Sequence, residues 1–420
     1  MKRGTRYTLL ALCAALTLAS PAFATNGDNL MAIGPIARSM GGVGIADPQD
    51  AISAVFSNPA AMCFGDWCPS TGMDFAATLF MPEVSTEITR PGQVIRSESD
   101  DSVYAIPAIG LSVPLSKNAP EWRFGLAAYG VSGLGVNYKK TDLESATLMP
   151  GAPLVAATYT ELQIMKFAPA ISYQVSDKWS LGLALNADYA TLDLGSGGAA
   201  GYGFGAQLGA IFRPTDKLSF GLTYTTPQTV THDAVTDFDG DGKWDDLKLQ
   251  APQQAGFGAA VSLFENKVLL EADVKWINWA NADGYEDFDW NDQTVLGLGL
   301  QVKPTRALAL RLGYNYSENP LEEHENFNGV FGQTTLIQGK EVPTYYYETF
   351  RLVGFPAITK HHLTFGAGYA FTERFTVNLA YTHGFEETMT EKGVDMTGQP
   401  VTLASTLTEQ SFDFGLSWKF

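Results

Sequence analysis

Charged residues, and basic residues above all, are scarce in this sequence. Asp, Glu, Lys and Arg make up 17% of the 420 residues, whereas about a quarter is usual in soluble proteins. The 27 Lys and Arg residues face 45 Asp and Glu residues, which leaves a formal net charge of -18. Because no basic stripe is present that could neutralise phosphates, we expect no nucleic acid among the partners. The chain is also too apolar for a disordered protein.

Long hydrophobic runs are missing too. No stretch after residue 24 approaches the roughly 18 consecutive apolar residues of a transmembrane helix. Residues 1–24 have the parts of a signal peptide: a basic start, a short apolar core and an A-x-A cleavage site at Ala22-Phe23-Ala24. The mature chain is therefore expected to start at Thr25. An exported chain of this composition without a spanning helix is either a large secreted β protein or an outer-membrane barrel.

Motifs for catalysis and for cofactor binding are also absent. The chain has no G-x-S-x-G element and no H-E-x-x-H pair, and no motif for binding a nucleotide is visible. We therefore expect no enzymatic activity and no required cofactor.

Glycine and strict two-residue alternation are what the sequence has in abundance. Glycine accounts for 42 residues and aromatic residues for 12%. At the C-terminus, Phe412, Phe414 and Leu416 share one face of a strand, and Asp413 and Gly415 share the other. A strand with one apolar face and one face of small or polar residues suits a barrel wall that separates lipid from a lumen.

Fourteen segments show this alternation, and their connections alternate in length. Tight turns follow every second segment, and the opposite side mostly carries longer links, which is the asymmetry of an outer-membrane barrel with periplasmic turns. We predict an all-β fold, a 14-stranded antiparallel transmembrane β-barrel. The segments cover residues 71–82, 102–114, 121–131, 158–175, 178–193, 199–213, 217–230, 250–264, 267–281, 292–303, 306–317, 358–371, 374–388 and 408–420.

A different kind of segment precedes the barrel. Residues 25–70 lack the two-residue period for most of their length and contain short helical turns broken by glycine. Because side chains alone cannot fill a barrel this wide, this segment is predicted to be a helical hatch that plugs the lumen. The domain organisation is thus a signal peptide (1–24), a hatch (25–70) and a transmembrane barrel (71–420). Within the hatch, Asn58-Pro59-Ala60 is the predicted anchor, because proline fixes the backbone and an Asn side chain can satisfy amides in an irregular segment.

The residues of this hatch carry a resemblance to a known family. Residues 34–44, 51–54 and 57–60 resemble the N-terminal hatch of the long-chain fatty-acid transporter (FadL) family, which includes aromatic-hydrocarbon uptake proteins. Further matches at residues 205–214, 310–316 and 363–371 extend the resemblance along the mature chain.

The resemblance implies a monomeric, plugged barrel that takes up hydrophobic small molecules such as long-chain fatty acids or hydrocarbons. Outer loops would capture the ligand, the lumen would receive it, and it would leave sideways into the bilayer beside a kinked third strand. Tyr129-Gly130 matches the aromatic-glycine pair of that kink, although an ordinary strand end before a loop is the alternative. The alternative function is a diffusion porin or an adhesion barrel.

Two sets of residues are candidates for contacting the ligand. Arg311 and Lys275 lie on the small-residue face, where they either bind a fatty carboxylate or belong to an ion-pair network that holds the plug. Apolar residues crowd two long loops and are predicted to capture the ligand, or to pack the loops over the barrel mouth, or both. The capture candidates are Leu148, Met149, Phe327, Phe331, Tyr345, Tyr346 and Phe350.

An Asp-rich loop is a candidate metal site. Asp237, Asp239, Asp241 and Asp245 follow the first part of a D-x-D-x-D-G calcium loop, but Lys248 stands where the bidentate glutamate would be. The loop is either a weak structural Ca²⁺ site on the outer side or a solvated acidic tip.

The end of the hatch and the C-terminus of the chain lead to two further expectations. Cys63 and Cys68 are the cysteines left after export, and the oxidising compartment predicts a disulfide between them. The last strand ends on Phe420, through which the barrel-assembly machinery would bind the chain. The expected surroundings are outer-membrane lipid and lipopolysaccharide.

Overall fold

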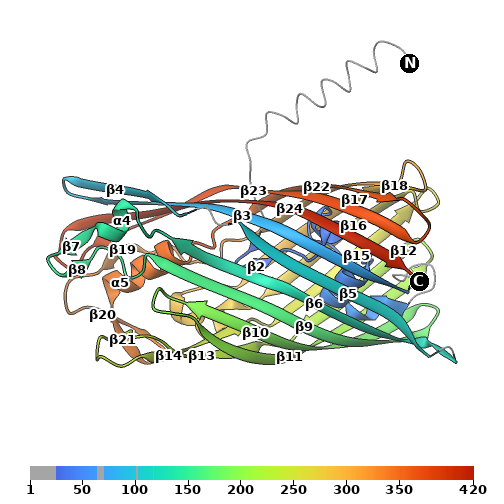
Figure 1. Cartoon of the computed structure of the whole chain (residues 1–420), viewed down its shortest axis with the longest axis horizontal. Helices are drawn as coiled ribbons and strands as arrows, with labels where there is room; N and C mark the ends of the chain where they lie inside the picture. The colour runs from blue at the N-terminus through green and yellow to red at the C-terminus, as the bar shows by residue number, and fades with distance from the viewer. Residues whose placement is uncertain (1–24, 64–70, 101–102, 117) are drawn as a thin grey trace, which may run out of the picture.

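The protein is an elongated barrel with an irregular segment inside it and a group of loops at one end (Figure 1). It is analysed as a computed structural model that describes residues 25–63, 71–100, 103–116 and 118–420. The expected signal peptide lies outside the described residues. None of the helices in the described ranges combines the length and the apolar character that a membrane crossing requires.

Fourteen strands of the described chain close into an antiparallel ring, as predicted. Each strand pairs with the next around the ring, and the last pairs with the first. In ring order these strands are β3 (Gly72–Arg90), β5 (Tyr104–Ser116), β6 (Ala119–Asn137), β9 (Tyr159–Ser176), β10 (Trp179–Asp193), β11 (Ala199–Thr215), β12 (Leu218–Thr225), β15 (Gln254–Leu263), β16 (Val268–Ile277), β17 (Gln293–Val302), β18 (Leu308–Ser317), β22 (His361–Ala370), β23 (Phe375–Val394) and β24 (Pro400–Lys419).

The two faces of the wall are those that the alternation predicts. In β17, Leu296 and Leu298 point outward and are 46% and 54% exposed. Gly297 and Gly299 point inward and contact Val43 of the inner segment. The apolar outer face therefore meets lipid, and the small-residue face encloses the lumen.

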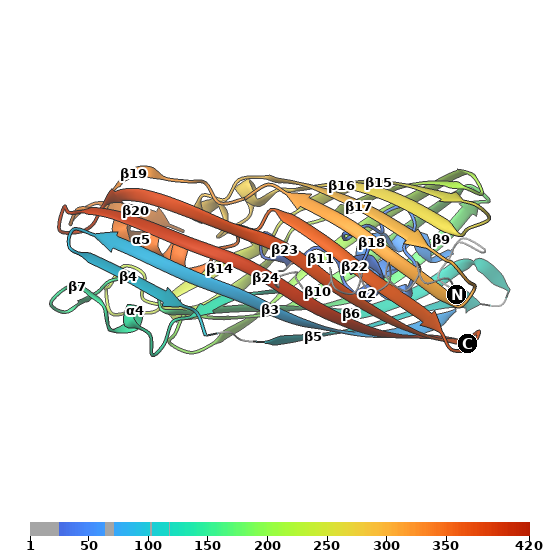
Figure 2. The ribbon, with the colours of Figure 1, turned by 90° about the horizontal axis from the view of Figure 1, so that it is seen from above.

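The inner segment, here called the hatch segment, comprises residues 25–62. It contains β1 (Thr25–Asn26), β2 (Asn29–Leu30), α2 (Pro35–Arg38), α3 (Ala51–Ser57) and the start of the 3₁₀ turn η1 (Pro59–Cys63). All but three of its residues are buried, and it lies within the outline of the barrel in both ribbon views (Figure 2). Its helices are short because glycines and prolines interrupt them, and Asp50 caps α3 through a capping box with Ser53.

Glycines on both sides let the hatch segment approach the wall closely. Gly41 has a positive φ of 70°, and a Cβ there would lie 2.5 Å from the carbonyl oxygen of Tyr314. A Cβ on Gly313 of β18 would lie 2.0 Å from the Gly41 nitrogen. The glycine content noted in the sequence therefore serves backbone-to-backbone packing between hatch and wall.

A cap of shorter elements covers one end of the barrel, on the left in Figures 1 and 2. Buried side chains of these elements and of the strand ends form the largest apolar cluster of the described residues. The cap elements are β4 (Gln93–Glu98), α4 (Asp142–Ser145), β7 (Thr147–Met149), β8 (Ala152–Pro153), β13 (Gln228–Thr236), β14 (Asp245–Ala251), η3 (Trp279–Asn281), η4 (Glu286–Phe288), β19 (Glu325–Asn328), β20 (Thr334–Ile337), β21 (Lys340–Pro343), α5 (Thr344–Thr349) and the π-helical turn η5 (Phe350–Gly354).

Four strands, β3, β6, β23 and β24, extend further toward the cap than the sequence predicts. In β24, Phe412 and Phe414 face outward in the lower part, whereas Leu403 and Leu407 point inward near the cap and are buried. The apolar residues change faces because the upper part of the strand leaves the bilayer and packs on the cap. This change interrupts the alternation on which the prediction was based. The predicted strand therefore starts at residue 408, eight residues after the observed start of β24. β3, β6 and β23 extend beyond their predicted ends in the same direction.

Candidate functional site

Two carboxylates of β16 hold the backbone of the hatch segment. Asp273 accepts hydrogen bonds from the N–H groups of Gly44 and Ile45 at 2.9 and 3.1 Å. Glu271 accepts them from Ala46 and Asp47 at 2.9 and 3.0 Å. The wall thereby provides hydrogen-bond acceptors for four consecutive backbone amides, which would have no partner within the irregular segment itself.

The two predicted partners for a ligand carboxylate contact protein groups. Lys275 Nζ donates to the carbonyl oxygens of Met31 and Gly42 in the hatch segment, at 3.2 and 3.4 Å. Arg311 donates to the amide oxygens of Gln301 and Asn378, at 2.8 and 3.0 Å. Lys275 also lines the lumenal cavity described below, whereas Arg311 is not among that cavity's lining residues.

Asn58 joins the hatch segment to two strands at once. Its side-chain amide donates to the carbonyl oxygens of Ile45, Ala210 and Leu222, at 2.8, 3.2 and 3.3 Å, and its Oδ1 accepts from the N–H of Ala60. Pro59 and Ala60 begin η1, which packs against β9, β10 and β11. The three predicted anchor residues therefore lie together where the hatch segment meets the wall.

An apolar pocket lies beneath the cap. Leu side chains of the strand ends form one side of it, and the aromatic residues Tyr285, Phe288 and Trp290 form the other. Phe350 and Phe355 complete it, and Arg351 is the charged residue in its lining. The pocket has a volume of about 40 Å³. Such an apolar lining with one charged group suits a hydrophobic ligand.

Two further cavities share lining residues with this pocket, and a third shares them with one of the two. The outer pocket shares Leu194 and Phe350 with it, and is also lined by Tyr346 and Tyr347. A small middle pocket shares Leu162, Leu249 and Tyr285 with it, and shares Ile164, Gln228 and Ala251 with a lumenal cavity of about 80 Å³. The four cavities are therefore neighbours in a row that leads from the cap to the hatch segment.

Tyr129 and Val131, which flank Gly130, line the lumenal end of this row. Pairing between β5 and β6 ends at Ala108 and Tyr129, and over the rest of β6 no pairing with the described residues of β5 is present. The register of β6 against β9 shifts between Gly130 and Ser132. Near the cap, the end of β6 is bonded to the segment that precedes β5: the Asp100 N–H donates to the Asn137 carbonyl at 2.7 Å. The stretch of β6 between these points, which does not pair with β5, is called the β6 edge below.

The predicted capture residues lie in the cap, with different exposures. Leu148, Phe327, Tyr345 and Phe350 are buried in its apolar cluster. Tyr346 and Met149 are partly buried against that cluster, and Phe331 is 77% exposed. Of the seven, Tyr346 and Phe350 line the cavities.

The sequence analysis named none of the aromatic residues on the loop after β16. Tyr285, Phe288 and Trp290 form edge-to-face and stacked contacts with one another or with Tyr347 and Phe350. Three aromatic residues within six positions of a loop were the available signal, since exposed aromatic clusters in loops mark binding surfaces.

The four predicted calcium ligands lie on the β13–β14 hairpin. The carboxylate oxygens of Asp237, Asp239 and Asp241 come within 4.8 Å of one another. Lys340 Nζ contacts Asp239 at 3.3 Å and Asp245 at 2.5 Å. The hydrogen bond from Lys243 lowers the pKa of Asp241, so this carboxylate is charged at neutral pH. The predicted cysteine pair cannot be placed, because the side chain of Cys63 and all of Cys68 lie outside the described residues.

We expect replacement of Asn58 by Ala to loosen the hatch segment and leave the barrel closed. The carbonyl of Ile45 would lose a buried donor, which costs about 1 to 3 kcal/mol. Hydrogen exchange measured by mass spectrometry should show faster exchange over residues 44–60, while the heat-dependent gel shift of a folded barrel stays unchanged. Asn58→Asp, which keeps the acceptor and loses the donors, should behave similarly. Unchanged exchange in both variants would contradict an anchoring role.

Comparison with known proteins shows which family and which solved structures this chain resembles. The family model described as "Outer membrane protein transport protein (OMPP1/FadL/TodX)" matches residues 11–200, and a search of the curated proteins finds no match. The Pseudomonas putida toluene transporter TodX has a TM-score of 0.64 and 19% identity, with 93% of this chain and 99% of that chain covered. A Pseudomonas aeruginosa FadL homologue has a TM-score of 0.64 at 14% identity, with 96% and 100% covered.

The Ralstonia pickettii toluene transporter TbuX also shares the fold, with a TM-score of 0.60, 17% identity and 93% and 99% of the two chains covered. At these identities the likeness to solved structures establishes the fold, and the family match covers the whole hatch segment and the first strands of the wall. The resemblance stated from the sequence is thus confirmed by the match over residues 11–200, and the chain has the fold of outer-membrane channels of the FadL/TodX type.

Proposed function

We propose that this protein takes up long-chain fatty acids or hydrocarbons by capture in the cap, transfer into the lumen and release sideways at the β6 edge. The observation that carries the proposal is the row of cavities, which share lining residues from the outer pocket to Tyr129 and Val131. No cofactor takes part. The toluene transporters TodX and TbuX share this fold. The ligand proposed for this chain is a fatty acid, an alkane or a monoaromatic.

Capture depends on the apolar lining of the two pockets under the cap. Burying apolar surface there gains about 25 cal/mol per Å². Aromatic side chains add large contact areas at little entropic cost, since each buries about 150 to 250 Å². A hydrophobe would therefore leave water for the cap before it meets the polar lumen.

Transfer passes a more polar region. Lys166 and Asp188 form an ion pair at 3.6 Å beside Gln228, whose amide oxygen accepts from Lys166. These groups line the middle pocket or the lumenal cavity. A ligand would cross this region along Ile164, Val230 and Leu249, which keep one side of the middle pocket apolar. The polar side makes the lumen a poorer resting place than the cap, so the ligand would not stay there.

Exit follows from the interrupted pairing at the β6 edge. Where neighbouring strands of the ring pair, backbone hydrogen bonds seal them, because unpaired groups are costly in lipid. At Ser132 the edge pairs with Asn29 of β2 instead of β5. The hatch segment thereby satisfies part of this edge and leaves the wall open to an apolar side chain or ligand. Release of a hydrophobe into the bilayer there would cost little, since both environments are apolar.

Assembly and oligomeric state follow the family in this proposal. The protein would act as a monomer, since one barrel contains every cavity that the path uses. Phe420, which follows β24 and is 61% exposed, would present the C-terminus to the barrel-assembly machinery.

Filling the shared wall of the two cap pockets should weaken capture. Leu194 lines both pockets and is half-buried, so Leu194→Trp can place an indole in them. We expect the Kd for a fluorescent fatty acid or a labelled monoaromatic to rise about tenfold or more, which is about 1.4 kcal/mol. Leu185→Trp, on the exposed outer face of β10, which ends one residue before Leu194, is the matched control. Unaltered affinity in Leu194→Trp would remove these pockets from the path.

Closing the β6 edge should slow delivery without weakening capture. A Cβ on Gly130 would lie 2.5 Å from Ile106 of β5, so the side chain in Gly130→Val would press against Ile106 where the pairing of the two strands ends. Cells carrying this variant should bind the fluorescent ligand normally yet grow several-fold more slowly on it as carbon source. Leu126→Val, on the outer face of β6, should grow like the wild type. Normal growth of Gly130→Val would rule out sideways release, and a wild type that binds none of the three ligand classes would rule out the proposed function.

The Asp-rich hairpin remains a predicted calcium site, and Lys340 offers a way to test it. A weak site with a Kd of about 10⁻⁴ to 10⁻³ M is expected, because the Lys340 ammonium already neutralises Asp239 and Asp245. Titration calorimetry should show weaker Ca²⁺ binding after Asp239→Asn or Asp241→Asn, and tighter binding after Lys340→Met. Equal heats in all four proteins would leave a solvated acidic tip.

A further inference from the structure

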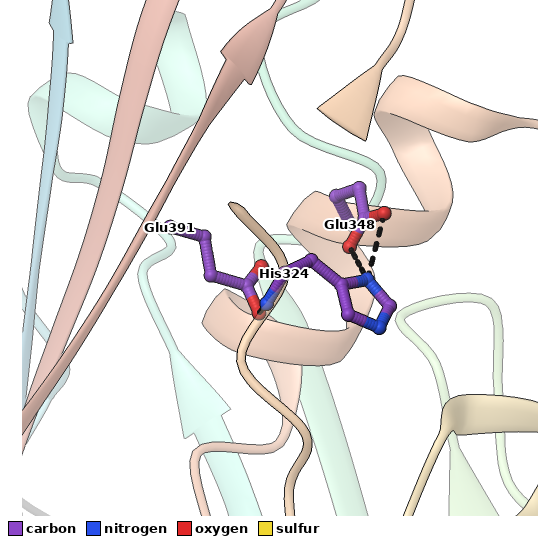
Figure 3. A group of neighbouring side chains, drawn as sticks. All are labelled: His324, Glu348 and Glu391. Atoms are coloured by element: carbon purple, nitrogen blue, oxygen red, sulfur yellow. Dashed lines mark hydrogen bonds and ion pairs between the residues drawn. The ribbon is translucent and has the colours of Figure 1, made fainter. Parts of the chain in front are cut away.

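A histidine and two glutamates from three separate elements meet inside the cap (Figure 3). His324 precedes β19, Glu348 belongs to α5 and Glu391 belongs to the extended part of β23. Their potential ligand atoms all lie within 4.8 Å of one another. None of the three residues lines a cavity of the row, although Arg351, which contacts both glutamates, lines the apolar pocket.

The donor atoms already stand at the spacing of neighbouring metal ligands. His324 Nδ1 lies 3.0 Å from each carboxylate oxygen of Glu348. Two donors bound about 2.1 Å from one ion lie roughly 3.0 to 3.4 Å apart. Glu391 approaches from the other side, and its Oε1 accepts the backbone N–H of His324 at 3.0 Å.

One carboxylate oxygen in the cluster has no partner. Glu391 is fully buried, and its Oε1 is bound by Arg351 and by the His324 amide, whereas its Oε2 has no hydrogen-bond partner among the described residues. An unsatisfied carboxylate oxygen at such a site is costly. A cation bound there would satisfy it and would leave the Arg351 ion pair in place.

The opposite edge of the imidazole has the support that metal-binding histidines use. Nε2 of His324 faces Asp289 Oδ2 at 3.5 Å, and Tyr347 donates its hydroxyl hydrogen to that same carboxylate. A histidine that binds a metal through one nitrogen usually donates the other N–H to a carboxylate, which fixes the tautomer and the ring. Here that arrangement would direct the Nδ1 lone pair toward Glu348 and Glu391.

The charges of the cluster leave room for a divalent cation. Asp289, Glu348 and Glu391 supply three negative charges, and Arg351, which also contacts Glu348 at 3.3 Å, supplies one positive charge. With a neutral imidazole the group has a net charge of about -2, which one divalent ion would balance.

We propose that His324, Glu348 and Glu391 form a binding site for a divalent transition metal such as Zn²⁺ inside the cap. One imidazole nitrogen with two carboxylates is a ligand set that suits zinc and neighbouring first-row ions, whereas calcium and magnesium prefer oxygen ligands alone. His324 is 22% exposed in its side chain, which gives an ion a way in. The ion would join α5, β23 and the segment before β19, and so stiffen the cap above the apolar pocket.

Zinc binding to the full mature chain in detergent tests this proposal. The protein should carry no polyhistidine tag, and the background should contain Asp239→Asn and Asp241→Asn so that the hairpin cluster cannot contribute. Competition with a chromophoric zinc indicator should give one Zn²⁺ per chain. His324→Gln and Glu391→Gln should each weaken binding about tenfold or more, and excess Ca²⁺ should not displace the ion. Glu323→Gln, which removes an exposed neighbouring carboxylate, should bind like the parent.

Two further measurements keep the outcome decisive. The heat-dependent gel shift shows whether each variant forms a barrel, and X-ray absorption of the zinc-loaded parent should show one imidazole among oxygen donors. The proposal is overturned if the parent binds no zinc. It is equally overturned if His324→Gln or Glu391→Gln, folded as a barrel, binds zinc as tightly as the parent, or if the bound ion has no imidazole ligand. None of these readouts depends on transport.

Discussion

The structure depends on satisfying the backbone of an irregular segment that is enclosed in a barrel. Every buried N–H and C=O group needs a partner, and the hatch segment has too little secondary structure to provide its own. The wall supplies these partners from side chains on its inner face. Glu271 and Asp273 of the wall accept hydrogen bonds from four consecutive amides of the hatch segment. In the other direction, Asn58 of the hatch segment donates to carbonyl oxygens of β11 and β12. Glu271 and Asp273 on the small-residue face thus serve the hatch segment.

A buried ion pair on the opposite side of the lumen extends the same principle. Arg38 at the end of α2 lies 2.9 Å from Asp413 of β24, and neither side chain is exposed. Arg38 also donates to the Ala32 carbonyl and to the Ser411 hydroxyl. A buried pair gains little net stability, but breaking it leaves an uncompensated charge. Such contacts therefore fix one position of the hatch segment more than they add to its stability.

The membrane-spanning part of the fold could be predicted from the sequence because lipid imposes one rule on all fourteen strands. Apolar residues face outward at every second position, as Leu296 and Leu298 do. That rule ends where a strand leaves the bilayer, and in β24 the buried residues Leu403 and Leu407 lie on the other face. The strand extensions were missed for this reason.

The candidate site was harder to predict, because its residues come together from distant parts of the chain. Of the two loops named for capture, the one that carries Tyr346 and Phe350 lines the pockets through these residues, whereas Leu148 and Met149 of the other loop do not line them. Their partners Tyr285 and Trp290 belong to another loop, and Leu162 and Leu249 come from strand ends. No local period marks such a set. The cluster of His324, Glu348 and Glu391 was missed for the same reason, since 67 residues separate its first and last members.

The cap and the hatch segment are held by different forces, and this difference favours the sideways path. Apolar contacts such as those of Phe288 with Phe350 in the cap have no strict direction, so a hydrophobic ligand can replace them at little cost. The hydrogen bonds from the hatch segment to Glu271 and Asp273 are directional, and a hydrophobe offers nothing in return for them. A ligand that displaced the hatch would leave buried carboxylates without partners. On the proposed path, a ligand that turned aside at the β6 edge would leave those bonds intact, so the plug would stay closed while the ligand passed.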